Sequence, residues 1–323
     1  MIYQLFKQYP NVVLGIGAFF IFLLTFICTG KLKDKLPADE GRDFAVDGKL
    51  SRGKPRGAGI IFISAFTIGS VIFVPFKIEY LVYLLLVFVE MLTGFMDDSS
   101  DKPWGRLKKG ILDLSVAVVL AFTYVYFNGN TFIIASLKSS FSIPTWIVYL
   151  LIIALTWTSI NVTNCADGVD GLSGSLVLTT LISFLVADSY LNYMYQFRFL
   201  ILFFIVAILA YLWFNAGPSI LMMGDAGSRA MGMFVSIVAL KSRMPLLYIP
   251  FAIVLALDGG LGLFKVTVIK LTKKRDFMNK VRTPLHDHVR KNIATTWSNN
   301  QVVMRFVIIQ AIIAIVTLYI FVR

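Results

Sequence analysis

Long apolar runs alternate with short polar connections along the whole chain. A membrane-spanning helix needs about 20 apolar residues, and most of these runs approach that length. The ten runs lie near residues 11–29, 58–74, 80–96, 111–127, 145–160, 171–187, 198–214, 228–240, 246–269 and 301–322. This pattern predicts an all-α, polytopic integral membrane protein with about ten transmembrane helices.

The composition excludes an ordinary soluble domain. Of the 323 residues, 58% are hydrophobic and 15% are charged, and the mean hydropathy is +0.79. These are too few polar residues to cover a water-facing surface. No low-complexity stretch or Pro-rich linker divides the chain, so we expect residues 1–323 to form a single integral membrane domain. The two cysteines, Cys28 and Cys165, suggest neither a disulfide framework nor a cysteine-based zinc site.

Lysine and arginine are distributed unevenly between alternate connections. The connections after runs one, three, five, seven and nine together hold 20 of them, whereas the two termini and the other connections hold 7. Positive charge is retained on the cytoplasmic side of a membrane, so this asymmetry predicts that both termini lie outside. The formal net charge of +12 is therefore a topological signal and does not indicate a nucleic-acid partner.

The unusual polar clusters all fall on the predicted cytoplasmic side, in the connections after runs three, five, seven and nine. They comprise Asp97 and Asp98, then Asn164, Asp167 and Asp170, then Asn215 and Asp225, and finally His286, Asp287 and His288. Acids gathered at a membrane surface favour Mg²⁺, which takes one or two carboxylates together with waters and phosphate oxygens. Glycine-rich turns before helices, as in DGVDGLSG and GDAGS, can face an anion. The sequence thus predicts a cytoplasmic site for a metal-bound phosphate compound.

Each of these features also has a purely structural interpretation. Asp97 and Asp98 are sequence neighbours whose side chains diverge on a helix, so they suit two separate roles or a solvated pair at a helix end. Glycine turns are common before helices, and two histidines can lie on a surface without function. Among the ionisable residues within apolar runs, four stand out because each either serves function or joins two helices. They are Glu90, Asp113, Asp258 and Lys265, and the glycines that follow Asp258 predict a bend there.

The motifs GKLSRGKPRG, GFMDD, NVTNCADGVDG, GDAGS and TPLHDHVRK occur in order between residues 48 and 291. Together they resemble the polyprenyl-phosphate N-acetylhexosamine-1-phosphate transferases, and KLTKKRDFMNKVRTPLHDH resembles their muramoyl-specific branch. The resemblance implies an enzyme of the bacterial cytoplasmic membrane. It would transfer phospho-N-acetylmuramoyl-pentapeptide from its UDP-activated donor to undecaprenyl phosphate, forming lipid I and UMP with Mg²⁺ as cofactor. It also implies a homodimer.

The resemblance also implies roles for individual residues. Asp225 matches the magnesium ligand, and Asp97 and Asp98 match a catalytic aspartate pair whose first member would prepare the lipid phosphate for attack. The implied substrate-binding residues are Arg52, Lys54, Lys108, Asn164, Asp167, Gly168, Asp170, Asn215, Met222, His286, Asp287 and His288. Lys109 is an alternative to Lys108. Two positions depart from the family, because Asp287 interrupts three histidines and Met222 replaces an aromatic residue.

Three alternatives remain open at this stage. The lipid phosphate attacks the donor's β-phosphorus directly, or a covalent aspartyl-phosphate forms first on Asp98. A sister transferase using UDP-N-acetylglucosamine or a related UDP-sugar would need the same metal core. A secondary transporter would also have about ten spans, but its binding site would lie near the bilayer midplane rather than at one surface.

Overall fold

The protein is described by a computed structural model that covers residues 2–41, 51–100, 102, 104–134, 139–274, 276–292 and 296–322. Within these residues the regular structure is helical apart from one antiparallel hairpin and an isolated β-bridge between Ala38 and Pro55. Each of the ten predicted apolar runs contains a helix. The helices are α1 (Ile2–Leu5), α2 (Pro10–Leu32), α3 (Gly59–Phe73), α4 (Ile78–Asp98), α5 (Arg106–Asn128), α6 (Thr145–Cys165), α7 (Leu172–Leu191), α8 (Arg198–Asn215), α9 (Gly224–Lys241), α10 (Tyr248–Phe251), α11 (Ile253–Thr272), α12 (Leu285–Lys291) and α13 (Asn299–Thr317). The strands are β1 (Thr131–Ile134) and β2 (Ser139–Ser142), and the short turns are Lys33–Lys35 and Pro245–Leu247 (3-10) and Leu318–Val322 (π-helical).

Helix α9 lies at the centre of the bundle, and its residues from Gly224 to Leu240 are all buried. It packs against α3, α4, α6 and α7. The closest approaches depend on glycine, because a Cβ at Gly94 of α4 would lie 2.5 Å from the carbonyl carbon of Asp225. A Cβ at Gly232 would likewise lie 2.5 Å from the carbonyl oxygen of Ser159 on α6. The first of these contacts brings the start of α9 against the end of α4, and the second brings the middle of α9 against α6.

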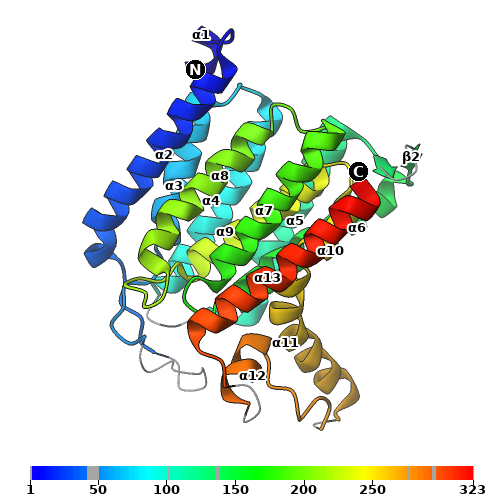
Figure 1. The fold of residues 1–323 in the computed structure, drawn as a ribbon. Helices are drawn as coiled ribbons and strands as arrows, with labels where there is room; N and C mark the ends of the chain where they lie inside the picture. Colours follow the sequence, from blue (N-terminus) through cyan, green and yellow to red (C-terminus); the bar gives the residue numbers. More distant parts are fainter. Residues whose placement is uncertain are drawn as a thin grey trace.

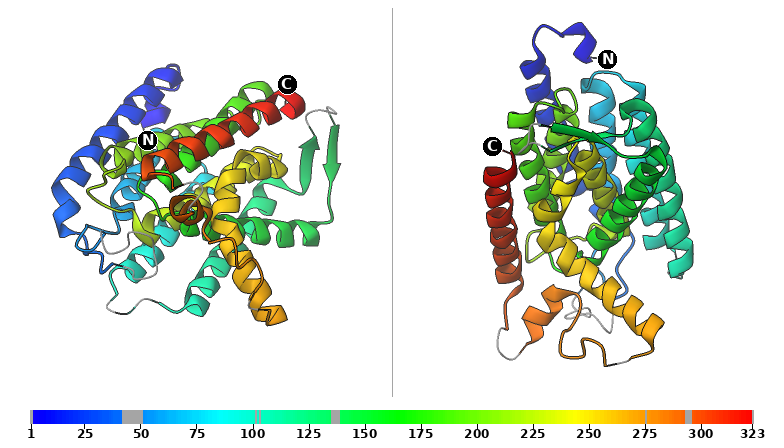
Figure 2. Two further views of the ribbon diagram at one scale, coloured as in Figure 1. Left: turned by 60° about the horizontal axis from the view of Figure 1, so that its bottom comes forward. Right: turned by 90° about the vertical axis from the view of Figure 1, so that its right-hand side faces the viewer.

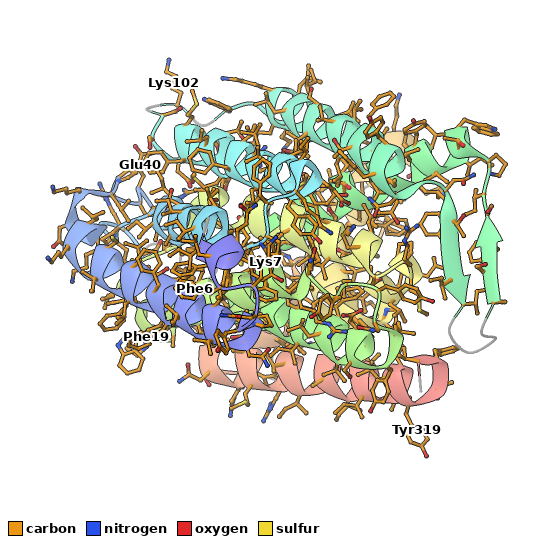
Figure 3. All side chains as sticks on the ribbon, turned by 90° about the horizontal axis from the view of Figure 1, so that it is seen from above. Phe6, Lys7, Phe19, Glu40, Lys102 and Tyr319 are labelled. Atoms are coloured by element: carbon orange, nitrogen blue, oxygen red, sulfur yellow. The ribbon has the colours of Figure 1, made fainter. Side chains whose placement is uncertain are left out.

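The outer helices carry large apolar side chains on their exposed faces. Phe19 on α2 is 66% exposed and Tyr319 is 71% exposed, and both point away from the bundle in Figure 3. Among the residues that the structure describes, seven helices are long and apolar enough to cross a membrane, or eight if α10 and α11 form one bent span. Because apolar surface of this extent is stable only in lipid, the prediction of a multi-pass helical membrane protein is confirmed.

The number of spans by this criterion is smaller than the ten predicted. Helix α3 has only 15 residues, and α9 carries three charged residues, Asp225, Arg229 and Lys241. Both helices are nevertheless present where the apolar pattern placed them. The difference therefore concerns which helices cross the bilayer, and not whether they form.

The predicted bend at Asp258 is wrong in position. The chain bends by 87° at Ala252, between α10 and α11, and Asp258 lies inside a continuous α11. Gly259 serves close packing instead, because a Cβ there would lie 2.8 Å from the carbonyl carbon of Val162 on α6. Helix α11 runs unbroken from Ile253 to Thr272 through this contact, so the glycine lets two helices approach without ending the helix.

The two ends of the bundle differ. At one end α4, α6 and α8 finish and α5, α7 and α9 begin, and α12 lies there too, at the bottom of Figure 1. We call this the site end. The hairpin β1–β2 and helix α1 lie at the opposite end, as does the end of α13. Figure 2 shows the site end turned toward the viewer on the left, with α11 projecting from the bundle.

Candidate active site

A pocket of about 680 Å³ opens at the site end. Eight of the predicted site residues line it, which are Lys54, Asn164, Asp167, Gly168, Asp170, Asn215, Met222 and Asp225. Residues that the sequence analysis did not single out also line it, among them Asp39, Arg56, Arg290, Asn299 and Asn300. The loops that follow α2, α6 and α8 therefore converge on one cavity, as does the start of α5.

The carboxylates of Asp97 and Asp98 diverge at the end of α4. Asp97 forms an ion pair with Lys109 and accepts a hydrogen bond from the Trp104 backbone N–H at 2.6 Å. Asp98 faces the other way. Its Oδ1 lies 2.9 Å from Nε of Arg56, and its Oδ2 accepts a bond from the Ala226 N–H at 3.1 Å. The two acids therefore have different partners, as expected for neighbours on a helix.

Asp225 is held in the first turn of α9 between two cations. Its Oδ2 lies 2.9 Å from Nζ of Lys109, and its Oδ1 lies 3.5 Å from a terminal nitrogen of Arg56. Gly224, just before it, has φ +67°, and a Cβ there would lie 2.8 Å from the carboxyl carbon of Asp98. The residue before Asp225 must therefore be glycine for this turn to fit against α4.

Arg56 joins three carboxylates and was not predicted from the sequence. Besides Asp98 and Asp225, it contacts Asp39 at 3.3 Å, and its side chain is 19% exposed. Burial by itself would lower the pKa of Arg56, but Asp98, Asp225 and Asp39 together raise that pKa above the ordinary value for arginine. The guanidinium is therefore a fixed positive charge at the centre of the acidic cluster.

The two other basic residues of this loop behave differently. Nζ of Lys54 donates a hydrogen bond to the Ser219 hydroxyl at 3.1 Å and lies 3.6 Å from Asp170. Lys54 thus lines the pocket. Arg52 is exposed and is not among the residues that line the pocket. The structure places Arg56, rather than Arg52, against the acids.

The choice of Lys108 requires a correction. Its side chain is exposed, and its Nζ lies 3.2 Å from the centre of the Trp104 ring. Lys109 reaches Asp97 and Asp225 instead. Consecutive residues on a helix point about 100° apart, so only one of the two lysines can face the pocket. The alternative, Lys109, is the one in the site.

Asn215 holds two glycine-rich turns together. Its Oδ1 accepts a hydrogen bond from the Gly171 N–H, and its Nδ2 donates one to the Leu221 carbonyl, both at 2.9 Å. Asp170 accepts a bond from the Ser219 N–H at 3.2 Å, which links the same two loops. These contacts fix the shape of the pocket wall between α6–α7 and α8–α9.

Nearer the acids, Asn164 donates to the Ser228 hydroxyl at 2.9 Å. The chain at Met222 is fixed on both sides, because its N–H donates to the Pro55 carbonyl at 2.8 Å and its carbonyl accepts from the Ala58 N–H at 3.0 Å. The loop that carries Arg56 is thereby attached to the loop that precedes α9.

The His286–Asp287–His288 segment contributes unequally. His286 is buried, and its Nδ1 lies 2.7 Å from Oδ2 of Asp258, whose Oδ1 accepts the His286 N–H at 2.7 Å. A Cβ on Gly168 would lie 2.7 Å from Cε1 of His286, so the imidazole supports the pocket loop from behind.

Asp287 pairs with Arg290, the residue of this helix that lines the pocket, at 3.3 Å. His288 accepts a hydrogen bond from the Arg282 N–H at 3.3 Å and is not among the lining residues. Helix α12 therefore presents Arg290 to the cavity, and His286 supports the pocket loop from behind.

The donor atoms around Asp225 suit Mg²⁺ in kind. They are carboxylate and amide oxygens, and Mg²⁺ needs only one or two carboxylates when phosphate oxygens and waters supply the rest. Within the described ranges, no three His, Cys, Asp or Glu side chains converge as a cage for a metal ion.

Comparison with known proteins agrees with this geometry. The profile of "Glycosyl transferase family 4" matches residues 80–243, from the start of α4 to just beyond α9. The matched segment contains Asp97, Asp98, Lys109 and Asp225. The protein is a bundle of membrane helices with an acidic, cation-bound site at one end. The chain belongs to glycosyl transferase family 4.

The relatives are more specific. The chain is 36% identical to the phospho-N-acetylmuramoyl-pentapeptide-transferase of Treponema pallidum (strain Nichols), over 97% of this chain and 90% of the relative. Proteins of the same name from Leptospira biflexa (29% identical, 92% and 87% covered) and Bartonella quintana (26%, 88% and 85%) are also similar.

Proposed function

We propose that this protein transfers phospho-N-acetylmuramoyl-pentapeptide from its UDP-activated donor to undecaprenyl phosphate, forming lipid I and UMP. The observation that carries the proposal is the cluster of Asp97, Asp98 and Asp225 with Arg56 and Lys109, at one end of a membrane-helix bundle. The similarity to the Treponema pallidum transferase over 97% of the chain supports this choice of substrates.

In the proposed reaction, an oxygen of the acceptor phosphate attacks the β-phosphorus of the donor. The bond between that phosphorus and the bridging oxygen breaks, and the bridging oxygen leaves with UMP. Arg56 and Lys109 would offset the negative charge of the diphosphate, because both face the pocket and both already bind carboxylates. Asp97, which shares Lys109 with Asp225, would prepare the acceptor phosphate for attack.

Mg²⁺ is part of the proposal as the cofactor held by Asp225, where it would neutralise charge on the bound diphosphate. Asp39 and Asp225 line the pocket and bring negative charge to it, which would attract a divalent cation. Asn164, Asp167 and Asp170 would line the nucleotide side, on the loop braced by Asn215.

The direct route has a covalent alternative on Asp98. Asp98 already engages Nε of Arg56 and the Ala226 N–H, which favours a positioning role over a nucleophilic one. Incubating the protein with donor and no acceptor, followed by mass spectrometry, distinguishes the two routes. Sugar phosphate bound to the protein would contradict direct attack.

The membrane arrangement in this proposal has ten spans, with α3 and α9 included and both termini outside. The site end would then face the cytoplasm of a bacterial cell membrane, where UDP-linked donors are made. The excess of Lys and Arg in the connections at the site end supports this orientation. A homodimer is also proposed, on the family resemblance alone.

The test is UMP release by the purified protein in detergent, with polyprenyl phosphate and Mg²⁺ present. We expect release with UDP-N-acetylmuramoyl-pentapeptide and none with UDP-N-acetylglucosamine. Release with UDP-N-acetylglucosamine alone would assign the sister activity. A folded protein that releases no UMP from either donor would contradict the proposed function altogether.

A further inference from the structure

A second layer of charged residues lies beneath the acidic site, on the same three helices. Glu90 is on α4, Asp113 on α5 and Arg229 on α9, and their residue exposures are 0%, 2% and 2%. None of the three lines the pocket. We call them the buried ionic layer.

The spacing of this layer repeats that of the site. Asp113 follows Lys109 by four residues, and Arg229 follows Asp225 by four residues. Glu90 precedes Asp97 by seven. Residues four and seven apart share a helix face, and a helix rises about 1.5 Å per residue. Each member of the layer therefore lies about 6 to 10 Å deeper than a site residue on the same helix face.

One guanidinium joins these helices. A terminal nitrogen of Arg229 lies 3.1 Å from Oε2 of Glu90, and the same nitrogen donates a hydrogen bond to Oδ1 of Asp113. Asn161 on α6 donates to Oδ2 of Asp113 at 3.1 Å. Four helices are thus connected through a cluster that substrate cannot reach.

Stability alone does not account for such a layer. Charges at membrane depth are costly, and a well-packed apolar cluster of similar volume often serves stability as well or better. Arg56 and Lys109, by contrast, face the pocket, so a bound diphosphate would compete with the acids for both cations. The layer offers what the site charges do not, a set of contacts between the same helices that does not change with substrate.

We propose that Glu90, Asp113 and Arg229 are positioning residues, which fix the relative heights of α4, α5 and α9 and thereby the geometry of Asp97, Lys109 and Asp225. This inference rests on the proposed function for its kinetic test. A displacement of about 1 Å at a reacting centre can reduce the rate about 10²-fold, so a small change in helix register is enough to matter.

The chain supplies a matched control at the opposite end of the same three helices. There Oε1 of Glu79 on α4 accepts hydrogen bonds from Lys241 on α9 at 2.8 Å and from Asn128 on α5 at 2.7 Å. Lys241 also donates to Asn128 at 2.8 Å. This cluster joins the same helices but lies far from the site along each of them.

The first experiment compares Arg229→Lys with Lys241→Met, measuring kcat and donor KM by UMP release together with thermal unfolding. Lysine keeps the charge but lacks the planar guanidinium, so it holds the two acids less well. We expect Arg229→Lys to lower kcat about 10-fold with donor KM and Tm nearly unchanged. Lys241→Met should lower Tm and leave kcat as it is.

A second variant removes the charges altogether, with Glu90→Leu, Asp113→Leu and Arg229→Met in one protein. Apolar replacement of a buried ionic triad commonly preserves stability, so we expect a folded protein with a near-normal Tm and a kcat at least about 10-fold lower. Full kcat in this variant would overturn the proposal. So would an Arg229→Lys protein that loses its thermal transition, because the layer would then serve stability.

A third readout does not depend on activity. Spin labels at Met96→Cys on α4 and Leu107→Cys on α5, both exposed positions, report the distance between the two helices in a background lacking Cys28 and Cys165. We expect Arg229→Lys to broaden this distance distribution and Lys241→Met to leave it unchanged. Unaltered distances in the Arg229→Lys protein would overturn this inference, whether or not the wild-type protein releases UMP. A wild-type protein that releases no UMP would instead overturn the proposed function.

Discussion

The two ends of α4, α5 and α9 use the same kinds of residue for different purposes. At the opposite end, Glu79 accepts hydrogen bonds from Lys241, Asn128 and the Tyr83 hydroxyl, all within 2.9 Å. At the site end, Arg56 and Lys109 hold the acids but face a cavity, with side chains 19% and 29% exposed. A closed cluster joins helices, whereas an open one keeps charges available to a ligand.

The two clusters differ in whether their charged groups are open to a cavity. Both clusters are anchored by the same central helix, which is buried from Gly224 to Leu240. At the site end several loops leave space around the charged groups, in a pocket of about 680 Å³. Substitutions at the two ends should therefore differ in their effect on turnover.

Asp225→Asn should nearly abolish turnover. The change removes the carboxylate charge that Lys109 and Arg56 surround and that would hold Mg²⁺. We expect a loss of at least about 10²-fold in kcat, together with weaker binding of Mn²⁺ measured by electron paramagnetic resonance. A variant that keeps its full rate at low Mg²⁺ would refute the assignment of Asp225.

Arg56→Gln should have the next largest effect, a loss of about 10²-fold in kcat/KM for the donor. It removes the one guanidinium shared by Asp39, Asp98 and Asp225. Lys54→Gln is the matched control, since Lys54 lies on the same loop but contacts Ser219 and Asp170. The control should raise donor KM more than it lowers kcat, and equal effects of the two changes would contradict a special role for Arg56.

Lys109→Gln and Lys108→Gln test the orientation of α5. Lys109 contacts two acids of the site, and Lys108 lies over the Trp104 ring. We expect the first change to lower kcat/KM about 10-fold, measured as UMP release, and the second to have little effect. If Lys108 were the more sensitive of the two, the described arrangement of this helix start would be wrong.

Glu79→Gln should have the smallest effect on turnover. It leaves Lys241 partly buried without its carboxylate partner, so the free energy of unfolding should fall by about 1 to 3 kcal/mol. Denaturation followed by circular dichroism measures this, and UMP release should be unchanged under native conditions. A large loss of kcat would show that the opposite end also controls the site.

Much of this arrangement could be predicted from the sequence. Each apolar run contains a helix, because hydropathy over about 20 residues directly reflects burial in lipid. The connections with Asp97, Asp167 and Asp225 also meet, as expected if they lie on one face of the membrane. Alternation of short connections is enough to place such loops at the same end of a bundle.

What the sequence could not provide is the direction of individual side chains. Arg52, Lys54 and Arg56 are two residues apart in one loop, and only the fold of that loop selects Arg56 for the acids. Lys108 and Lys109 differ by one step on a helix whose rotation depends on packing. The position of Arg290 in the pocket depends on where α12 packs, and α12 is attached to α11 by the Asp258–His286 contact.

The proposed transfer of sugar phosphate to the lipid is tested by following the phosphorus atom that is transferred. Donor radiolabelled at its β-phosphorus is incubated with the purified protein, Mg²⁺ and undecaprenyl phosphate, and the lipid and aqueous fractions are separated. We expect the label to enter the lipid fraction while unlabelled UMP is released in equal amount. Label recovered in the aqueous fraction, as inorganic phosphate or unchanged donor, would contradict it.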